Sequence, residues 1–113
     1  MERINFDEYE TVVLVYYYLQ FKNGLMYRED AIEKVSYILR ERAYTNRDKI
    51  DDSFRSIAGI TRQMKKVEEE YLEKKYTQST PSILIRKYIT MYKNDLNTFI
   101  SKLKEFKIGL YSD

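Results

Sequence analysis

Apolar residues in this chain recur every three or four positions and not at alternate positions, and this spacing constrains the fold more than any other feature of the sequence. Four stretches show it, at about residues 7–22, 29–43, 53–75 and 81–106. Because an apolar stripe of that period covers one side of a helix, the sequence predicts an all-α fold, a compact four-helix domain. No linker or internal repeat divides residues 1–113, so we expect a single helical domain.

The predicted helices have recognisable ends. Asn23-Gly24 follows the first helix, and glycine suits the left-handed conformation that terminates many helices. Ser53 is the expected N-cap of the third helix, and Thr80-Pro81 opens the fourth, where proline lacks an N–H that the first turn does not need. The stretch 81–106 then predicts one long C-terminal helix that packs across the other three.

The same spacing predicts which side chains face the core. In the second helix the buried stripe comprises Ile32, Val35, Ser36, Leu39 and Ala43. In the third helix it comprises Phe54, Ile57, Thr61, Met64, Val67 and Tyr71. The run Tyr16–Tyr18 points in three directions around the first helix, so at least one of these rings is expected to be exposed.

The composition excludes most catalytic chemistry. The chain has no Cys and no His, which removes thiol nucleophiles, the commonest general base and the commonest metal ligand. We therefore expect no enzyme activity, no cofactor and no metal. Asp51-Asp52 could bind a divalent cation, but helix capping explains the pair, and Glu68–Glu70 is interpreted as a solvated face. The apolar run 12–19 is too short to span a bilayer, so the prediction is a cytoplasmic protein without a membrane partner.

Positive charge is concentrated in the middle of the chain. The formal net charge is only +2, yet residues 40–66 carry 8 basic and 4 acidic side chains. If residues 53–75 form one helix, Arg55, Gly59, Arg62 and Lys66 follow one another along its exposed face, with Ser56 and Gln63 beside them. A solvated helix face rich in Lys and Arg is the plainer interpretation of this pattern.

A basic face on the second of two helices joined by a polar turn is what a helix-turn-helix DNA reader requires. On this interpretation a glycine lets the helix backbone approach double-stranded DNA, Arg and Gln contact bases or phosphates, and Lys contacts phosphates. The predicted nucleic-acid-binding residues are Lys49, Arg55, Ser56, Gly59, Arg62, Gln63, Lys65 and Lys66.

Three segments carry a resemblance to a known family. They are residues 6–10 (Phe-Asp-Glu-Tyr-Glu), residues 32–40, and residues 53–67, which include a Phe-Arg-Ser-x-x-Gly-Ile pattern. Over about residues 6–70 the chain resembles the N-terminal helical DNA-binding domain found ahead of HNH nuclease domains in modification-dependent (type IV) restriction endonucleases. The resemblance implies DNA binding with sensitivity to base modification, in a restriction or anti-phage defence context. The matching positions are Ser36, Leu39, Arg40, Phe54, Arg55, Gly59 and Lys65. Cleavage is not implied, because the chain has no His for a nuclease segment.

Two other functions remain open at this point. The near-neutral net charge and the 12 Tyr also fit a small protein-interaction module, such as a phage or plasmid inhibitor of a bacterial defence enzyme. The chain could also be one piece of a larger nuclease.

Overall fold

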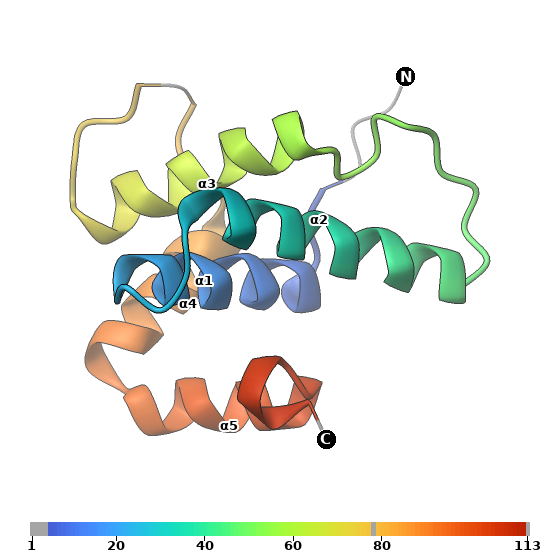
Figure 1. The fold of residues 1–113 in the computed structure, drawn as a ribbon. Coiled ribbons are helices and arrows are strands. Elements are labelled where there is room, and N and C mark those ends of the chain that lie inside the picture. The colour runs from blue at the N-terminus through green and yellow to red at the C-terminus, as the bar shows by residue number, and fades with distance from the viewer. Residues whose placement is uncertain (1–4, 78, 113) are drawn as a thin grey trace.

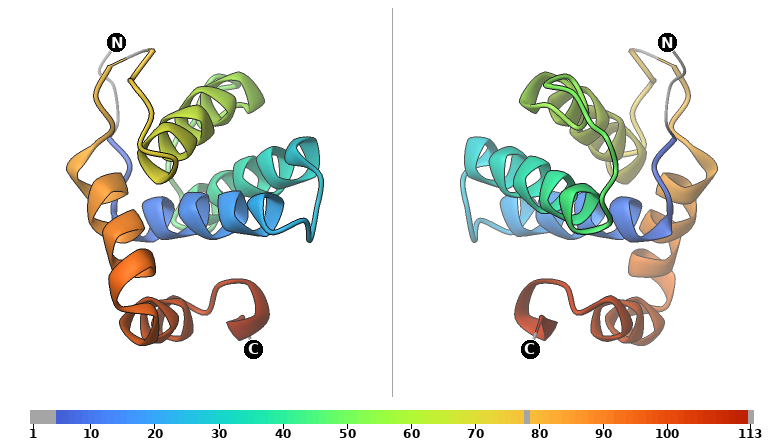
Figure 2. Two further views of the ribbon diagram at one scale, coloured as in Figure 1. Left: turned by 90° about the vertical axis from the view of Figure 1, so that its left-hand side faces the viewer. Right: turned by 90° about the vertical axis from the view of Figure 1, so that its right-hand side faces the viewer.

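The computed structural model describes residues 5–77 and 79–112, and this part of the chain is entirely helical between its loops. Its elements are α1 (Glu8–Lys22), α2 (Arg28–Thr45), α3 (Ile57–Tyr71), α4 (Ile83–Asn94), α5 (Leu96–Phe106) and a 3-10 helix, η1 (Gly109–Tyr111). Helices α2 and α3 lie on one side of α1, α4 crosses it, and α5 lies on its opposite side (Figures 1 and 2). The Cα radius of gyration of 13.6 Å is that of a compact domain of this length.

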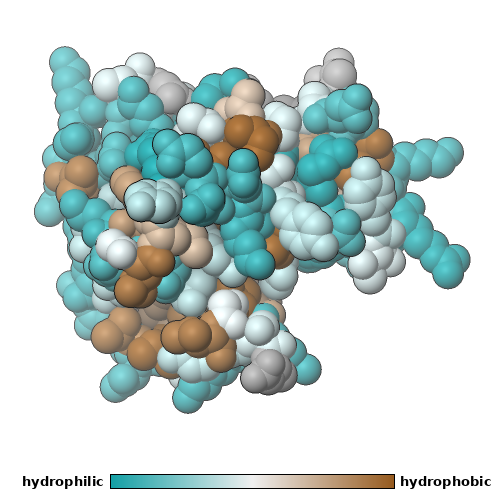
Figure 3. Space-filling model, viewed as in Figure 1, coloured by the Kyte–Doolittle hydropathy of each residue, from teal (hydrophilic) through white to brown (hydrophobic). Residues whose placement is uncertain are grey.

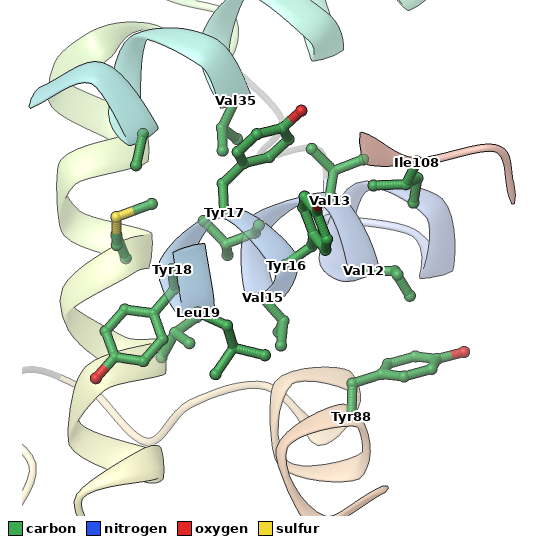
Figure 4. Packing of buried hydrophobic residues seen from close by; sticks show 14 of the residues in the cluster. Val12, Val13, Val15, Tyr16, Tyr17, Tyr18, Leu19, Val35, Tyr88 and Ile108 are labelled. Carbon is green, nitrogen blue, oxygen red and sulfur yellow. The ribbon is translucent and has the colours of Figure 1, made fainter. Parts of the chain in front are cut away.

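Helix α1 is the centre of the core. Every residue from Glu10 to Leu19 is buried, because α2, α3, α4 and α5 all pack on this helix. The three neighbouring tyrosines point in different directions but none is exposed (Figure 4). The Tyr16 hydroxyl accepts a hydrogen bond from the Leu110 N–H of η1 at 3.4 Å. The centroid of the Tyr18 ring lies 5.7 Å from that of the Tyr71 ring of α3. The expectation of one exposed ring was wrong, because a helix that is apolar on all sides lies inside the domain.

Helix α2 agrees with its sequence pattern. All five residues predicted to face the core are buried: Ile32, Val35, Ser36, Leu39 and Ala43. The turn predicted at Asn23-Gly24 is also confirmed: Gly24 has φ +77, and the Leu25 N–H donates to the Gln20 carbonyl at 2.9 Å, which closes the end of α1. Helices α2, α3 and α5 end with the same kind of bond, from a backbone N–H to the carbonyl five residues earlier, although their left-handed residues are Arg47, Glu73 and Lys107.

Helix α3 is shorter than the predicted 53–75 and presents a different face to the core. Its N-cap is Ser56, whose Oγ accepts the Gly59 N–H at 3.2 Å. The buried apolar side chains are Ile60, Met64 and Val67, so the expectation was right for Met64 and Val67. It was wrong for Ile57 and Thr61, which are exposed. The packing of α3 on both α1 and α4 selects the buried face.

The predicted long C-terminal helix is two helices, so the four-helix count was wrong for the described residues. The chain breaks at Asp95, which has φ −150 and ψ 69, and the Asp95 side chain accepts the Thr98 N–H at 3.3 Å and the Thr98 hydroxyl at 2.6 Å. Helix α4 itself begins after Ser82 and not at Pro81. The break lets Phe99 and Leu103 of α5 reach the side of the core that α4 leaves uncovered.

The connection between α2 and α3 does not have the form that a helix-turn-helix needs. It comprises the eleven residues 46–56, whereas that motif joins its helices by three or four residues. A helix-turn-helix core is therefore not confirmed, and the all-α class is. Hydrophilic side chains dominate the surface over α2 and α3, and apolar ones gather over the α4–α5 corner (Figure 3).

Candidate nucleic-acid interface

A groove with a volume of about 1040 Å³ runs beside α3. One wall is α3, and the opposite wall is the segment 79–85, which passes behind α3 in the view of Figure 1 and includes the start of α4. Parts of the loop 49–55, the N-terminal residues Asn5 and Phe6, and Thr11 of α1 also line the groove. Lys66 connects the two walls, because its Nζ donates to Ser79 Oγ at 2.9 Å.

Six of the eight predicted nucleic-acid-binding residues line this groove. They are Lys49, Arg55, Gly59, Arg62, Gln63 and Lys66. The last four are spaced at i, i+3, i+4 and i+7 on α3, so they share one face of the helix, as their spacing predicts. Ser56 and Lys65 do not line the groove: Ser56 caps α3, and Lys65 is exposed elsewhere on that helix.

Arg55 lies in the groove lining but not on the helix face where the sequence placed it. The residue precedes α3, with φ +47. Its Nε and Nη2 donate to Glu10 Oε2 and Oε1 at 2.7 and 3.0 Å, and the two side chains are 8% and 7% exposed. The rings of Phe6 and Phe54 lie 4.1 and 4.6 Å from the guanidinium. The expectation of an exposed arginine was wrong, because Glu10, 45 residues away, neutralises and buries it.

The loop before α3 is fixed to α2 by side chains that donate to its carbonyl groups. Ser36 Oγ donates to the Arg55 carbonyl at 2.7 Å, and Arg40 Nη1 donates to the carbonyl groups of Asp51 and Phe54 at 3.1 and 2.5 Å. Ser36, Arg40, Phe54 and Arg55 are four of the seven positions that the family resemblance singled out. These four positions therefore hold the loop and the start of α3 in place.

Besides Arg55, three cationic side chains line the groove, those of Lys49, Arg62 and Lys66, and they differ in their hydrogen-bond partners. Lys49 and Arg62 are exposed and make no hydrogen bond or ion pair with any described residue. Lys66 is half-buried, and its partner is a neutral hydroxyl. Among the described residues of the lining, Asp51 is the only acidic one, and its Oδ1 accepts bonds from Ser53 N, Ser53 Oγ and Phe54 N at 3.0, 2.7 and 3.1 Å. These neutral donors leave the negative charge of Asp51 in place, but Lys49, Arg62 and Lys66 outnumber it, so the described lining carries a net positive charge.

Gly59 has ordinary space around it. A Cβ atom added there would lie 3.5 Å from Ser56 Oγ and 4.0 Å from Arg62 Nη2, which are normal contact distances. No packing against another helix therefore requires a glycine at this position in α3. What the residue does provide is a bare stretch of backbone on the face that lines the groove.

The two acidic clusters serve the fold. The hydrogen bonds from Ser53, its hydroxyl first, lower the pKa of Asp51, and they cap the turn before α3. Glu69 was expected on a solvated face, but it is buried and accepts the Thr77 hydroxyl at 2.6 Å, which lowers the pKa of Glu69. Within residues 5–77 and 79–112, no group of three or more acidic residues is placed to hold a metal ion.

The sequence reasoning did not identify the wall opposite α3. Ser79, Thr80, Ser82 and Ile83 belong to it, and Ile83 is 82% exposed. The local pattern at Thr80-Pro81 predicts the start of a helix but not a place in the groove, because these residues join the groove only through the packing of α4.

The comparisons with known proteins add no relative. No family model matches the chain, and neither the curated proteins nor the solved structures contain a match. The resemblance to restriction endonucleases therefore stays a prediction that rests on the motifs themselves. In the described part of the chain, no helix has the length and apolar character that crossing a membrane requires.

Proposed function

We propose that this protein binds DNA through the cationic side of the groove. The observation that carries the proposal is the convergence of Lys49, Arg62 and Lys66, from a loop and a helix, on one concavity whose described lining holds a single carboxylate, that of Asp51. A phosphodiester backbone supplies the negative charge that such a surface lacks, and its binding releases counterions. Gln63 adds an amide that can pair with a base edge.

Helix α3 is the contact element in this proposal, as in the predicted helix-turn-helix, but the long loop 46–56 replaces the tight turn. Lys49 on this loop and Lys66 on α3 would contact phosphates. Arg55 keeps a positioning role through Glu10. The restriction or defence context and the sensitivity to base modification are proposed from the sequence resemblance alone.

The test is fluorescence anisotropy with labelled DNA across a salt series, with and without methylated cytosine. Binding should weaken steeply as salt rises, and Lys49→Gln should lower the salt slope by about one phosphate contact. Lys34→Gln is the matched control, because Lys34 is an exposed lysine on α2 outside the groove. Absence of salt-sensitive binding at low ionic strength, with or without methylation, would reject the proposal.

A second candidate function is protein binding through the outer face of α2. Tyr37 and Tyr44 lie seven residues apart on that face and are 62% and 54% exposed, and tyrosine is enriched at protein interfaces. This candidate predicts a complex that survives nuclease treatment and is lost in Tyr37→Ser/Tyr44→Ser. Lys49→Gln should leave such a complex intact.

A further inference from the structure

We infer that the groove accepts an unpaired DNA strand in preference to a duplex. The inference rests on the proposed function and specifies its ligand. It follows from the shape of the cationic surface and from the chemistry of the wall that faces it.

The cations line a hollow and do not stand on a ridge. A helix that reads duplex DNA must insert its side chains into a major groove about 12 Å wide and 8.5 Å deep. Here the α3 face that carries Arg62 and Lys66 looks across to the segment 79–85, and Lys66 is already bonded to Ser79. Gly59 and Gln63 on the same face are half-buried. A duplex therefore meets the flanking segment before it meets this face, whereas a single strand is narrow enough to lie between the walls.

The opposite wall offers contacts that only an unpaired base can use. Ile83 exposes 82% of an apolar side chain at the groove, and Leu84 lines it too. Thr80 and Ser82 place hydroxyl groups on the same wall. In a duplex the flat faces of the bases are stacked on one another, but in a single strand they can pack on a protein side chain.

The two walls together match two parts of a nucleotide, its phosphate and its base. Lys49, Arg62 and Lys66 supply positive charge for the phosphates along one side, and Ile83 supplies an apolar contact for bases along the other. Proteins that bind single strands combine a cationic groove with aromatic side chains on which bases stack. Here the exposed aliphatic side chain of Ile83 takes the place of the aromatic ring, and it is the residue that distinguishes the unpaired strand from the paired one.

The test compares one labelled 20-nucleotide strand with the duplex of the same sequence, on the full chain at one low salt concentration. We expect the single strand to bind at least tenfold more tightly. Ile83→Ser should weaken single-strand binding severalfold and leave duplex binding nearly unchanged. Leu110→Ser is the matched control, since Leu110 is 84% exposed and lies outside the groove. Thermal melting by circular dichroism checks that both variants remain folded.

The outcomes separate the two proposals. Equal or tighter binding of the duplex, or an Ile83→Ser variant that binds the single strand as the wild type does, overturns the single-strand preference and leaves DNA binding intact. Failure to bind either form overturns the proposed function itself. A single-strand preference that is lost in Ile83→Ser and kept in Leu110→Ser supports the inference.

Discussion

The loop before α3 and the first turns of α3 each carry an arginine, but one arginine is buried in an ion pair and the other is exposed. Arg55 in the loop is buried against Glu10, and its backbone is held by Ser36 of α2. Arg62, seven residues later, is exposed beside the groove and makes no hydrogen bond or ion pair with a described residue. Two arginines that look equivalent in the sequence therefore differ in role: the first stabilises the fold, and the second is available to a ligand.

The largest expected effect is the loss of stability on Arg55→Ala. The substitution leaves the Glu10 carboxylate buried without its main partner, and breaking a buried ion pair in this way costs about 3–5 kcal/mol. Arg62→Ala makes the same chemical change at an exposed site and should change the free energy of unfolding by less than about 0.5 kcal/mol. Urea denaturation of both variants gives the comparison directly.

A double variant tests the cause of that loss. Glu10→Gln/Arg55→Ala also removes the negative charge of the Glu10 carboxylate that Arg55→Ala leaves unpaired. The double variant should therefore recover part of the stability lost in Arg55→Ala. Equal costs for Arg55→Ala and Arg62→Ala would mean that the contrast between the two arginines does not hold in solution.

A smaller effect is expected where α2 holds the loop. Ser36→Ala removes the hydroxyl that donates to the part-buried Arg55 carbonyl, and leaving such a group without its partner costs about 1–3 kcal/mol. Thr61→Ala is the control, because the Thr61 hydroxyl is exposed and bonds only within α3. Chemical denaturation should separate the two variants, and a Ser36→Ala cost no greater than that of Thr61→Ala would show that the loop does not depend on this bond.

Arg62→Ala should have its effect on binding and not on stability. Loss of one phosphate contact lowers DNA affinity across sequences and reduces the salt slope by about 1. Anisotropy titrations at several salt concentrations measure both quantities, with Lys34→Gln as the variant of equal charge change outside the groove. Unchanged affinity and slope in Arg62→Ala would remove this residue from the proposed interface.

These contrasts show which features the sequence could predict. The helical period and the Asn23-Gly24 turn correctly located α1 and α2, because both signals are local. The break at Asp95 also had a local signal, since Asp is a good N-cap, but the apolar period continued through it and concealed it. Full burial of α1 could have been inferred from a helix with no polar side along residues 11–19.

The candidate site was predicted in part for the same reason. Gly59, Arg62, Gln63 and Lys66 share a face because helical spacing alone determines it. The burial of Arg55 depends on Glu10, and the opposite wall depends on how α4 packs against α1 and α3. Both are contacts between distant parts of the chain, which periodicity cannot detect.

The smallest expected effect concerns Gly59 and has opposite signs for folding and for binding. Alanine fits the space at this helical position and should raise the free energy of unfolding by about 0.5–1 kcal/mol. Gly24→Ala is the matched control: it also has free space, but its φ of +77 should make alanine destabilising. If a strand approaches the α3 backbone, Gly59→Ala should nevertheless weaken DNA binding, because the added methyl group projects from the face that lines the groove. A variant that gains stability and loses affinity would mean that Gly59 favours ligand binding and lowers the stability of α3. Arg55 has the opposite role, because it stabilises the fold.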